Sequence, residues 1–536
     1  MMRMTALPAL LLMSLNPCAA QDRPNILLII ADDLGYADLG VHGSDIRTPN
    51  IDGLADDGLL FTQFHASPYC STTRAMLFTG NNNHVAGVAR QAIDPGPVIP
   101  GLAGYEARLA TERVAVLPGL LRDAGYRTYT VGKWHLGETL DSSPWAAGFD
   151  RSFMMKFGGG SHFTGIGLRE TSAPKYFRDN TETDWPDGEY STELFTDTLI
   201  GYLEEDRADE RPFFMVAAYT SPHWPLQVPD EDLDLYAGRY DMGYDRLREL
   251  NFERLKAAGI VPPDSNLPPR NPDITPFDDL SADQQRRDTR SMELYAAMVE
   301  NLDRHVGRLL DYFRDNGLYD DTLIVFMSDN GAAADTPDVP GGVFHEYVRE
   351  HYDITTYERM GQRGSFVTYG PQWAEAGSAP FRLRKGFPAQ GGIVAPMIMT
   401  GPAVARRGEF TDAYITVMDI MPTLLELAQT GYPQDKIPML GESAAGFLAG
   451  EAEAIHAADY VTAFSHAQLS FLRQGDWKLL SLGRPFDERY FELFNLADDP
   501  GETTDLSDQN PVKRQELIEL WRDHRRRLGI VLPQDL

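Results

Sequence analysis

Cysteine is scarce in this chain: among 536 residues, only Cys18 and Cys70 carry a thiol. Two cysteines cannot form the disulfide network that holds small secreted domains together, so the fold must depend on a hydrophobic core. The sequence also lacks clusters of histidine and cysteine at the spacing of a structural zinc site. Disulfide-rich scaffolds and zinc-binding modules are therefore excluded.

Positive charge is also in short supply. Lys and Arg number 48 against 79 Asp and Glu, which gives a formal net charge of -31 at pH 7. Such a chain repels the phosphates of nucleic acids, so nucleic acid is excluded as a partner. If the substrate is a small anion, its site must gather basic side chains locally, because the long-range field of the protein opposes its approach.

Long apolar runs are missing, and the most apolar stretch lies near the start. Residues 7–15 form a short apolar run behind the positive Arg3, and small residues follow the run. This layout predicts a cleaved signal peptide over residues 1–20 and a secreted or periplasmic protein. A lipid anchor on Cys18 is the alternative, which the preceding Pro17 disfavours. No later run reaches the roughly 18 to 20 apolar residues that span a bilayer, so we expect no membrane span.

Cleavage of the signal peptide would leave Cys70 as the single thiol of the mature chain. A lone thiol is either a small buried apolar residue or a reactive group, and the polar neighbours of Cys70 favour the second. The helical pattern that follows places Cys70 at a helix N-terminus, where backbone N–H groups attract anions and Arg74 offers a planar fork. On its own, this setting favours an acidified, nucleophilic thiol.

Short continuous apolar runs mark strands that are buried on both faces and indicate an α/β protein. Each run is followed by residues that can bind a metal or move a proton. Because ligands of such sheets bind beyond the carboxyl ends of the strands, we expect these residues to meet at one rim. The predicted strands are 25–31, followed by Asp32 and Asp33; 127–131, followed by Lys133 and His135; 212–219, followed by His223; and 322–327, followed by Asp329 and Asn330.

Other segments complete the outline of two domains. Helices are expected over 294–313 and over 416–427, with Pro422 near the start of the second, and the Pro-rich stretch 261–276 predicts an irregular excursion. We predict a catalytic domain over 21–440 and a small C-terminal domain over 441–536 with an antiparallel sheet and a helix. The C-terminal elements are expected at 470–472, 477–482 and 490–495 for the strands and at 511–528 for the helix.

The tips of two predicted strands carry oxygen ligands that suit a metal ion. Asp32, Asp33, Asp329 and Asn330 all present side-chain oxygens at those tips. This donor set suits a hard divalent cation. Calcium fits an exported, oxygen-rich site best, and magnesium is the second choice.

Motifs spread over most of the mature chain resemble the type I sulfatases of the alkaline phosphatase superfamily. Cys70 and Arg74, with Thr79-Gly80 after them, match the family's C-x-P-x-R signature. The long middle segment 244–269 and the residues NNNHVAGV after Gly80 look most like the bacterial aryl and alkyl sulfatases. Further matches are Asp32-Asp33, the segment GKWHLG at 132–137, His223 in a P-H-x-P segment, Asp329-Asn330 in SDNGA, Lys385 before a Gly-Gly pair, and the C-terminal stretch 493–502.

The resemblance implies both an architecture and a reaction. The architecture is an alkaline-phosphatase-like domain with a mixed, mostly parallel central sheet flanked by helices. The reaction is hydrolysis of a small-molecule sulfate monoester, aryl or alkyl, by formylglycine (3-oxoalanine) that a formylglycine-generating maturation enzyme makes from Cys70. The hydrated aldehyde would bind the cation together with Asp32, Asp33, Asp329 and Asn330, and would attack sulfur. The other implied roles are alignment of the nucleophile by Arg74, charge stabilisation by Lys133 and Lys385, protonation of the leaving group by His223, and general base catalysis by His135.

One position departs from the family pattern, because Thr72 stands where the family has Pro. This leaves open whether maturation is oxygen-dependent or of a radical type, and whether Cys70 stays unmodified. Two other functions also stay open: a phosphonate monoester or phosphodiester hydrolase on the same fold, and a non-catalytic binding protein. Residues 333–379 are expected to shape the substrate pocket. His65, His84 and His162 have no comparable support for a catalytic role and stay structural or substrate-pocket candidates.

Overall fold

The computed structural model describes residues 23–91, 102–170, 175–186, 188–334, 345–466 and 468–532. The predicted signal peptide and ten residues of the predicted pocket-shaping segment, 335–344, lie outside the described residues. None of the helices in the described part combines the length and the apolar character needed to cross a membrane.

A 10-stranded mixed sheet forms the centre of the molecule, in the order β11-β2-β10-β9-β1-β8-β4-β5-β6-β7. The five strands from β9 to β5 are parallel, whereas β10, β6 and β7 bring antiparallel pairings. The fold class predicted from the sequence is confirmed. The strands are β1 Asn25–Ala31, β2 Gly58–Phe61, β4 Arg127–Lys133, β5 Arg151–Met155, β6 Tyr176–Arg178, β7 Thr181–Thr183, β8 Phe213–Ala218, β9 Thr322–Ser328, β10 Met397–Thr400 and β11 Glu409–Thr411, and a separate pair joins β3 Phe64–His65 to β12 Ile415–Thr416.

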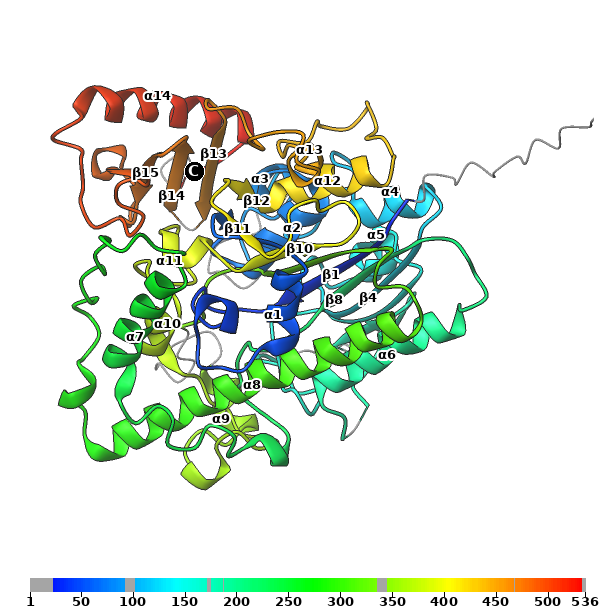
Figure 1. The fold of residues 1–536 in the computed structure, drawn as a ribbon, viewed down its shortest axis with the longest axis horizontal. Coiled ribbons are helices and arrows are strands. Elements are labelled where there is room, and N and C mark those ends of the chain that lie inside the picture. Colours follow the sequence, from blue (N-terminus) through cyan, green and yellow to red (C-terminus); the bar gives the residue numbers. More distant parts are fainter. Residues whose placement is uncertain are drawn as a thin grey trace, which may run out of the picture.

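Strand β1 is buried on both faces and feeds two hydrophobic cores. Its side chains alternate, so that Leu27 and Ile29 join one core while Leu28 and Ile30 join the other. Helix α8 (Ala282–Asp315) packs its apolar face on the first core and runs along that face of the sheet (Figure 1). The other helices on the first core are α1 Pro49–Asp56, α6 Ser191–Glu205, α7 Gly243–Ala257, α9 His345–His351 and α10 Gly370–Gly377; those on the second are α2 Cys70–Thr79, α3 Asn83–Ala86, α4 Leu117–Asp123, α5 Pro144–Ala147, α12 Ile420–Leu427 and α13 Ala445–Leu448.

The register of the parallel strands sets their carboxyl ends level. Ala31 of β1 pairs with Ser328 of β9, and Ile30 pairs with Ala218 of β8. Ala218 in turn pairs with Gly132 of β4. The residues that follow these strands therefore leave the sheet at one edge, as the sequence predicts.

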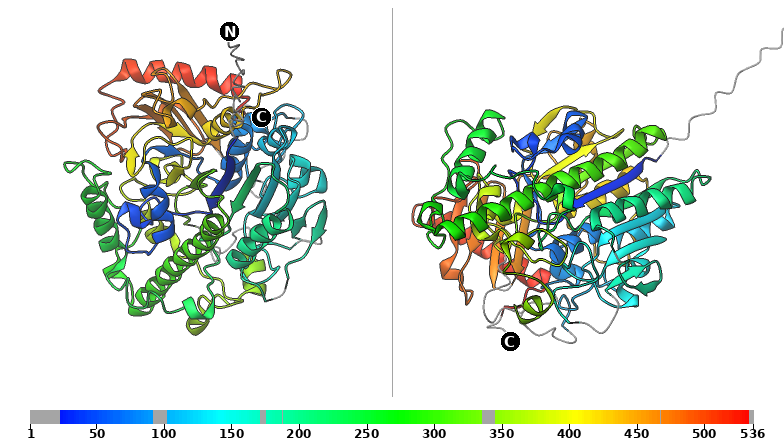
Figure 2. Two further views of the ribbon diagram at one scale, coloured as in Figure 1. Left: turned by 45° about the vertical axis from the view of Figure 1, so that its right-hand side comes forward. Right: turned by 90° about the horizontal axis from the view of Figure 1, so that it is seen from below.

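A second, antiparallel sheet of four strands lies at the C-terminal end of the chain. One of its faces packs under α14 (Pro511–Leu528), with Trp521 fully buried, and the other packs on the preceding part of the chain through Phe471 and Phe494. Figure 2 shows α14 in red on the outer side of these strands. The strands are β13 Val461–His466, β14 Leu469–Gln474, β15 Trp477–Ser481 and β16 Glu492–Asn495, and α11 (Gln390–Ile393) lies on the inner side. The domain boundary between 440 and 441 stays a prediction.

Some element boundaries differ from those expected. The segment 416–427 is not one helix, because a 3-10 turn over 417–419 precedes α12 and places Pro422 third in the helix. The last strand begins at Glu492 instead of residue 490, since 488–490 forms a 3-10 turn. Strand β4 extends to Lys133, two residues further than predicted, because its glycine allows a close approach to β8.

Gly132 provides a test of the geometry at the carboxyl edge of the sheet. It adopts a φ of 99°, and an added Cβ would lie 1.7 Å from the carbonyl oxygen of Ala218. We therefore expect Gly132→Ala to destabilise the protein by at least ~1–3 kcal/mol. Gly53→Ala is the control, because a Cβ on Gly53 of α1 meets nothing within 4 Å and helix propensity favours Ala. Urea unfolding measures both, and equal midpoints would contradict the expectation.

Candidate active site

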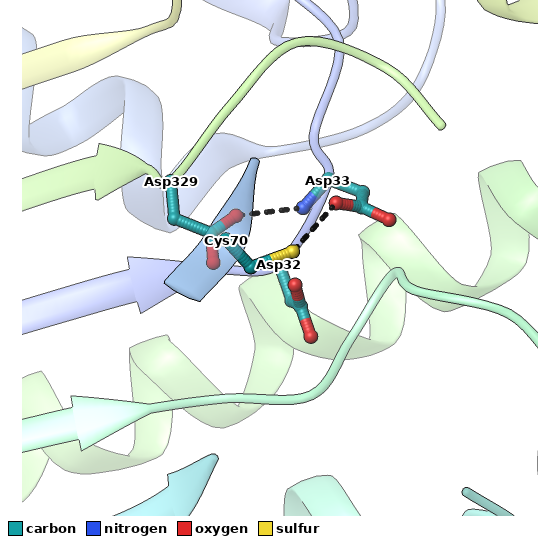
Figure 3. A group of neighbouring side chains, drawn as sticks. All are labelled: Asp32, Asp33, Cys70 and Asp329. Carbon is teal, nitrogen blue, oxygen red and sulfur yellow. Dashed lines mark hydrogen bonds between the residues drawn. The ribbon is translucent and has the colours of Figure 1, made fainter. Parts of the chain in front are cut away.

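Oxygen and sulfur ligands from three distant segments meet at the carboxyl edge of the sheet. Ligand atoms of Asp32, Asp33, Cys70 and Asp329 all lie within 4.8 Å of one another (Figure 3). All four side chains are buried, and Cys70 is 1% exposed. Asp32 and Asp33 extend from β1, Asp329 follows β9, and Cys70 begins α2. The convergence predicted from the strand ends is confirmed.

Asn330 completes this group and has an orphaned oxygen. Its Nδ2 donates to Oδ1 of Asp33 at 2.7 Å and to the carbonyl oxygen of Gly331 at 2.8 Å. Its Oδ1 is buried and accepts no hydrogen bond from the described residues. A buried acceptor without a donor is costly, and a cation would satisfy it. Three carboxylates and this amide oxygen are the hard donors that calcium and magnesium prefer, so the residues present fit a divalent cation.

Each of the three carboxylates is paired with a cationic side chain. Lys133 contacts both oxygens of Asp32 at 2.7 Å, and Lys385 contacts those of Asp33 at 2.6 and 2.7 Å. Arg74 donates to Oδ2 of Asp329 from Nε at 3.0 Å and from Nη2 at 2.7 Å. The local gathering of basic groups that an anionic substrate requires is therefore present, despite the acidic composition of the chain.

Arg74 differs in orientation from the expected anion-binding fork. Besides Asp329, its guanidinium donates from Nη1 to the carbonyl oxygen of Lys133 at 2.6 Å. The side chain is 1% exposed. Arg74 therefore fixes the carboxylate of Asp329 and the end of β4, and does so with three of its donors.

The crowding of charges shifts the carboxylate pKa values in opposite directions. Burial raises the pKa of Asp32 to about 7, and the neighbouring Asp329 and Asp33 add to this against the opposing effect of Lys133. Burial also disfavours the charged form of Asp33, but Lys385 and His223 outweigh it and lower the pKa of Asp33. The two adjacent carboxylates thus differ in how firmly they hold a proton, because the charges around Asp33 outweigh its burial, whereas those around Asp32 do not.

Cys70 lies among these charges as a thiol. Its Sγ lies 3.5 Å from Oδ1 of Asp33 and accepts a hydrogen bond from Nζ of Lys385 at 3.2 Å. Burial and the carboxylate of Asp329 raise the pKa of Cys70 well above its ordinary value, although Lys133 and Lys385 oppose the shift. The acidified thiol expected from a helix N-terminus is therefore wrong. Desolvation and the neighbouring carboxylates outweigh the helix end.

Two histidines face the same space. His223 donates from Nδ1 to the carbonyl oxygen of Trp224 at 2.6 Å, which leaves Nε2 directed at Asp33, 3.4 Å away. His135 follows β4 with a φ of 59°, and its Nδ1 has no hydrogen-bond partner among the described residues. Burial lowers the pKa of His135, and the positive charges of Lys133, Arg74 and Lys385 lower it further. His135 is therefore neutral and able to accept a proton. The predicted site residues are all brought together.

The loop that carries Lys385 is anchored from the C-terminal sheet, which the sequence analysis missed. Lys478 of β15 donates to the carbonyl oxygen of Pro388 at 2.8 Å and to Oε1 of Gln390 at 3.1 Å. Glu502 accepts from the backbone N–H of Gln390 at 2.9 Å and pairs with Lys478 at 2.6 Å. A lysine within an apolar strand was the available signal, but its partners in the Lys385 loop, Pro388 and Gln390, lie 90 and 88 residues away along the chain.

The fold and the side chains at the site together indicate which class of protein this chain belongs to. A doubly covered α/β sheet presents, at its carboxyl edge, a cation-binding group of oxygens, a nucleophile position at a helix N-terminus, basic side chains and two histidines. These are the functional groups that a metal-dependent hydrolase of an anionic ester requires.

Comparison with known proteins identifies the family. A model of the family described as Sulfatase matches residues 24–430. An uncharacterized sulfatase of Schizosaccharomyces pombe is 37% identical over 544 residues, covering 98% of this chain and 97% of the relative. An arylsulfatase of Klebsiella aerogenes is 36% identical over 438 residues, covering 79% and 92%. The chain belongs to the sulfatase family.

The solved structure of Ps i-CgsB shares the fold. Its TM-score is 0.67 at 24% identity, with 96% of this chain and 94% of that chain covered. At this identity the likeness concerns the fold alone. Family membership confirms the predicted enzyme class: the protein is a sulfuric ester hydrolase that cleaves sulfate monoesters.

The anchor beneath the Lys385 loop yields a stability prediction. Lys478→Met removes the closest cation of the buried carboxylate of Glu502 and leaves only Arg382, whose Nε lies 3.6 Å away, so we expect a loss of ~3–5 kcal/mol in the free energy of unfolding. Adding Glu502→Gln removes the uncompensated charge and recovers part of the loss. Lys513→Met on α14, whose partner Glu516 is exposed, is the control and is expected to change stability by less than ~1 kcal/mol. Denaturant unfolding that ranks the two lysine variants equally would contradict the role of the anchor.

Proposed function

We propose that the protein is an exported aryl or alkyl sulfatase that uses a calcium ion and a formylglycine made from Cys70. The observation that carries the proposal is the position of Cys70, with its sulfur among the carboxylates of Asp32, Asp33 and Asp329 and beside Lys385. The relationship to an arylsulfatase supports the substrate class. Export rests on the predicted signal peptide over 1–20.

The cation would be held by Asp32, Asp33, Asp329 and the orphaned Oδ1 of Asn330. When bound, it supplies a positive charge that polarises the sulfate ester and stabilises an ionised nucleophile at position 70. Calcium is the proposed ion because all of these donors are oxygens and the protein is proposed to act outside the cytoplasm.

Conversion of Cys70 answers a difficulty that the structure presents. A buried thiol with a raised pKa is mostly protonated near neutral pH, and a protonated thiol is a poor nucleophile. Formylglycine supplies instead a hydrated aldehyde with two hydroxyl groups. One can attack sulfur, and loss of the proton from the other lets the enzyme release sulfate.

The charged side chains around position 70 have separable tasks in this scheme. Lys385 lies closest to the nucleophile and would bind the non-bridging oxygens of the sulfate ester. Lys133 and Arg74 are buried and paired with Asp32 and Asp329, so we assign them the positioning of these ligands. His223 directs Nε2 into the site. Because its Nδ1 proton is donated to the carbonyl of Trp224, His223 would protonate the departing alcohol or phenol from Nε2 in its doubly protonated form, whereas the neutral His135 would take the proton from the second hydroxyl.

Thr72 fits the helix start in place of the family's Pro. Its hydroxyl donates to the carbonyl oxygen of Tyr69 at 2.8 Å and also contacts Ser67. The side chain is buried, and α2 begins at Cys70 as the motif requires. We propose that a maturation enzyme that accepts this threonine converts Cys70 before the chain folds, because Cys70 is inaccessible afterwards.

The mass of the active-site peptide tests the conversion. In protein purified from its native host, the peptide with position 70 is expected to be lighter than the cysteine form, and Cys70→Ala is expected to abolish sulfatase turnover. Because Cys70→Ala removes only a small side chain, the free energy of unfolding should change by less than ~2 kcal/mol. Fully active protein that contains only the thiol would refute formylglycine as the nucleophile.

Removal of one metal ligand tests the cation site. For the parent protein, calcium at 100 times its dissociation constant is expected to stabilise the fold by about 2.7 kcal/mol. Asp329→Ala is expected to lose this calcium-dependent stabilisation together with most of the activity, because it removes a ligand and unpairs Arg74. Asp123→Asn, an exposed aspartate of α4, is the control. Thermal unfolding with calcium, with magnesium and with a chelator measures the effect; a variant that responds as the parent does would contradict the assignment.

A further inference from the structure

His162 forms hydrogen bonds that tie it to the loop of His223, although its sequence context gave no sign of a role. The side chain is 1% exposed. Its Nε2 lies 3.0 Å from the carbonyl oxygen of His223, and its Nδ1 lies 2.7 Å from Oγ of Ser191. Because His162 contacts the backbone carbonyl of His223, it can fix the position of His223.

The partners of His162 determine its protonation state. Burial lowers the pKa of His162 to about 4, so the ring is neutral near pH 7. A carbonyl oxygen only accepts, so the single ring proton must lie on Nε2 and be donated to His223. Nδ1 is then an acceptor, and the hydroxyl of Ser191 donates to it.

The glycines before His162 allow the same segment to lie against the rings of both active-site histidines. A Cβ added to Gly159 would lie 2.9 Å from Cε1 of His223. A Cβ added to Gly158 would lie 2.7 Å from Cε1 of His135. Both distances are shorter than real Cβ contacts, so any other residue would push a ring out of place.

Further hydrogen bonds join this segment to the loop of His223 as one unit. The side-chain oxygen of Gln227 accepts from the backbone N–H of His162 at 2.9 Å and from Oγ of Ser161 at 3.1 Å. The amide nitrogen of Gln227 donates to the carbonyl oxygen of Ser365 at 2.7 Å. The segment, which runs from the end of β5 toward α6, is therefore held on the loop that follows β8.

We propose that the segment 158–162 is a positioning element that aims Nε2 of His223 at the leaving group. His162 holds the carbonyl of His223, Gly159 supports its ring, and the carbonyl of Trp224 holds its Nδ1. With these three constraints only Nε2 faces Asp33 and the site. His162 is thus a positioning residue, and the inference rests on the proposed role of His223 as proton donor.

Leaving-group dependence distinguishes this role from a merely structural one. An ester with a good leaving group, p-nitrophenyl sulfate, needs little protonation, whereas phenyl sulfate needs a well-placed acid. We expect His162→Leu to lower kcat on phenyl sulfate by roughly 10-fold or more and on p-nitrophenyl sulfate by less than about 3-fold, with KM little changed. His162→Gln keeps an amide N–H that can reach the carbonyl of His223, and it is expected to recover most of the loss.

Matched variants control for folding and bulk. His305→Leu removes a buried histidine of α8 outside the site and is expected to affect both esters equally. Gly159→Ala is expected to reproduce the selective loss on phenyl sulfate, whereas Gly201→Ala in α6, where a Cβ meets nothing within 4 Å, is not. If His162→Leu does not fold, Gly159→Ala and His162→Gln test the positioning role instead. The measured quantity is again the ratio of kcat on phenyl sulfate to kcat on p-nitrophenyl sulfate.

His223→Asn separates failure of this inference from failure of the proposed function. If His223→Asn loses activity equally on both esters, His223 is not the proton donor, and the positioning role falls with it. If His223→Asn shows the selective loss but His162→Leu and Gly159→Ala do not, the proton donor stands and the positioning element is refuted. Selective loss in all three variants, with recovery in His162→Gln, supports the inference.

Discussion

The structure depends on a balance of buried charge at the carboxyl edge of the sheet. Asp32, Asp33 and Asp329 are each taken out of water, and each is held against one cationic side chain. A buried carboxylate without such a partner would take up a proton or destabilise the fold. The pairs therefore keep ligand oxygens for a cation in place, in a chain whose overall charge would otherwise drive anionic substrates away.

The same arrangement makes the site suited to sulfate ester chemistry. Electrostatic interactions are stronger where water is excluded, and the donors are already oriented before the substrate arrives. Level strand ends provide this orientation, because the register that aligns Ala31 with Ser328 also aligns the ligands that follow them. The rigid central strands therefore hold the ligand side chains at defined positions.

Two supports that lie outside the group of ligand side chains hold the site in place. The C-terminal sheet anchors the loop of Lys385 through the buried pair Lys478–Glu502. The segment 158–162 bears on His223 and His135 from the side of β5. The C-terminal sheet thus supports the site, because its removal would leave the loop that carries Lys385 without its buried anchor.

The sequence by itself determined the central strands and the membership of the site. Continuous apolar runs such as 25–31 indicate strands buried on both faces, and the polar residues directly after parallel strands are expected at one edge of the sheet. The other strands of the large sheet and β13 escaped prediction. Those of the large sheet have three to five residues, too few to show a pattern of their own. The tertiary structure alone decided that Arg74 faces Asp329, that Cys70 has a raised pKa, and that His162 holds His223. Orientation and protonation depend on neighbours brought from distant parts of the chain, and local sequence carries no record of them.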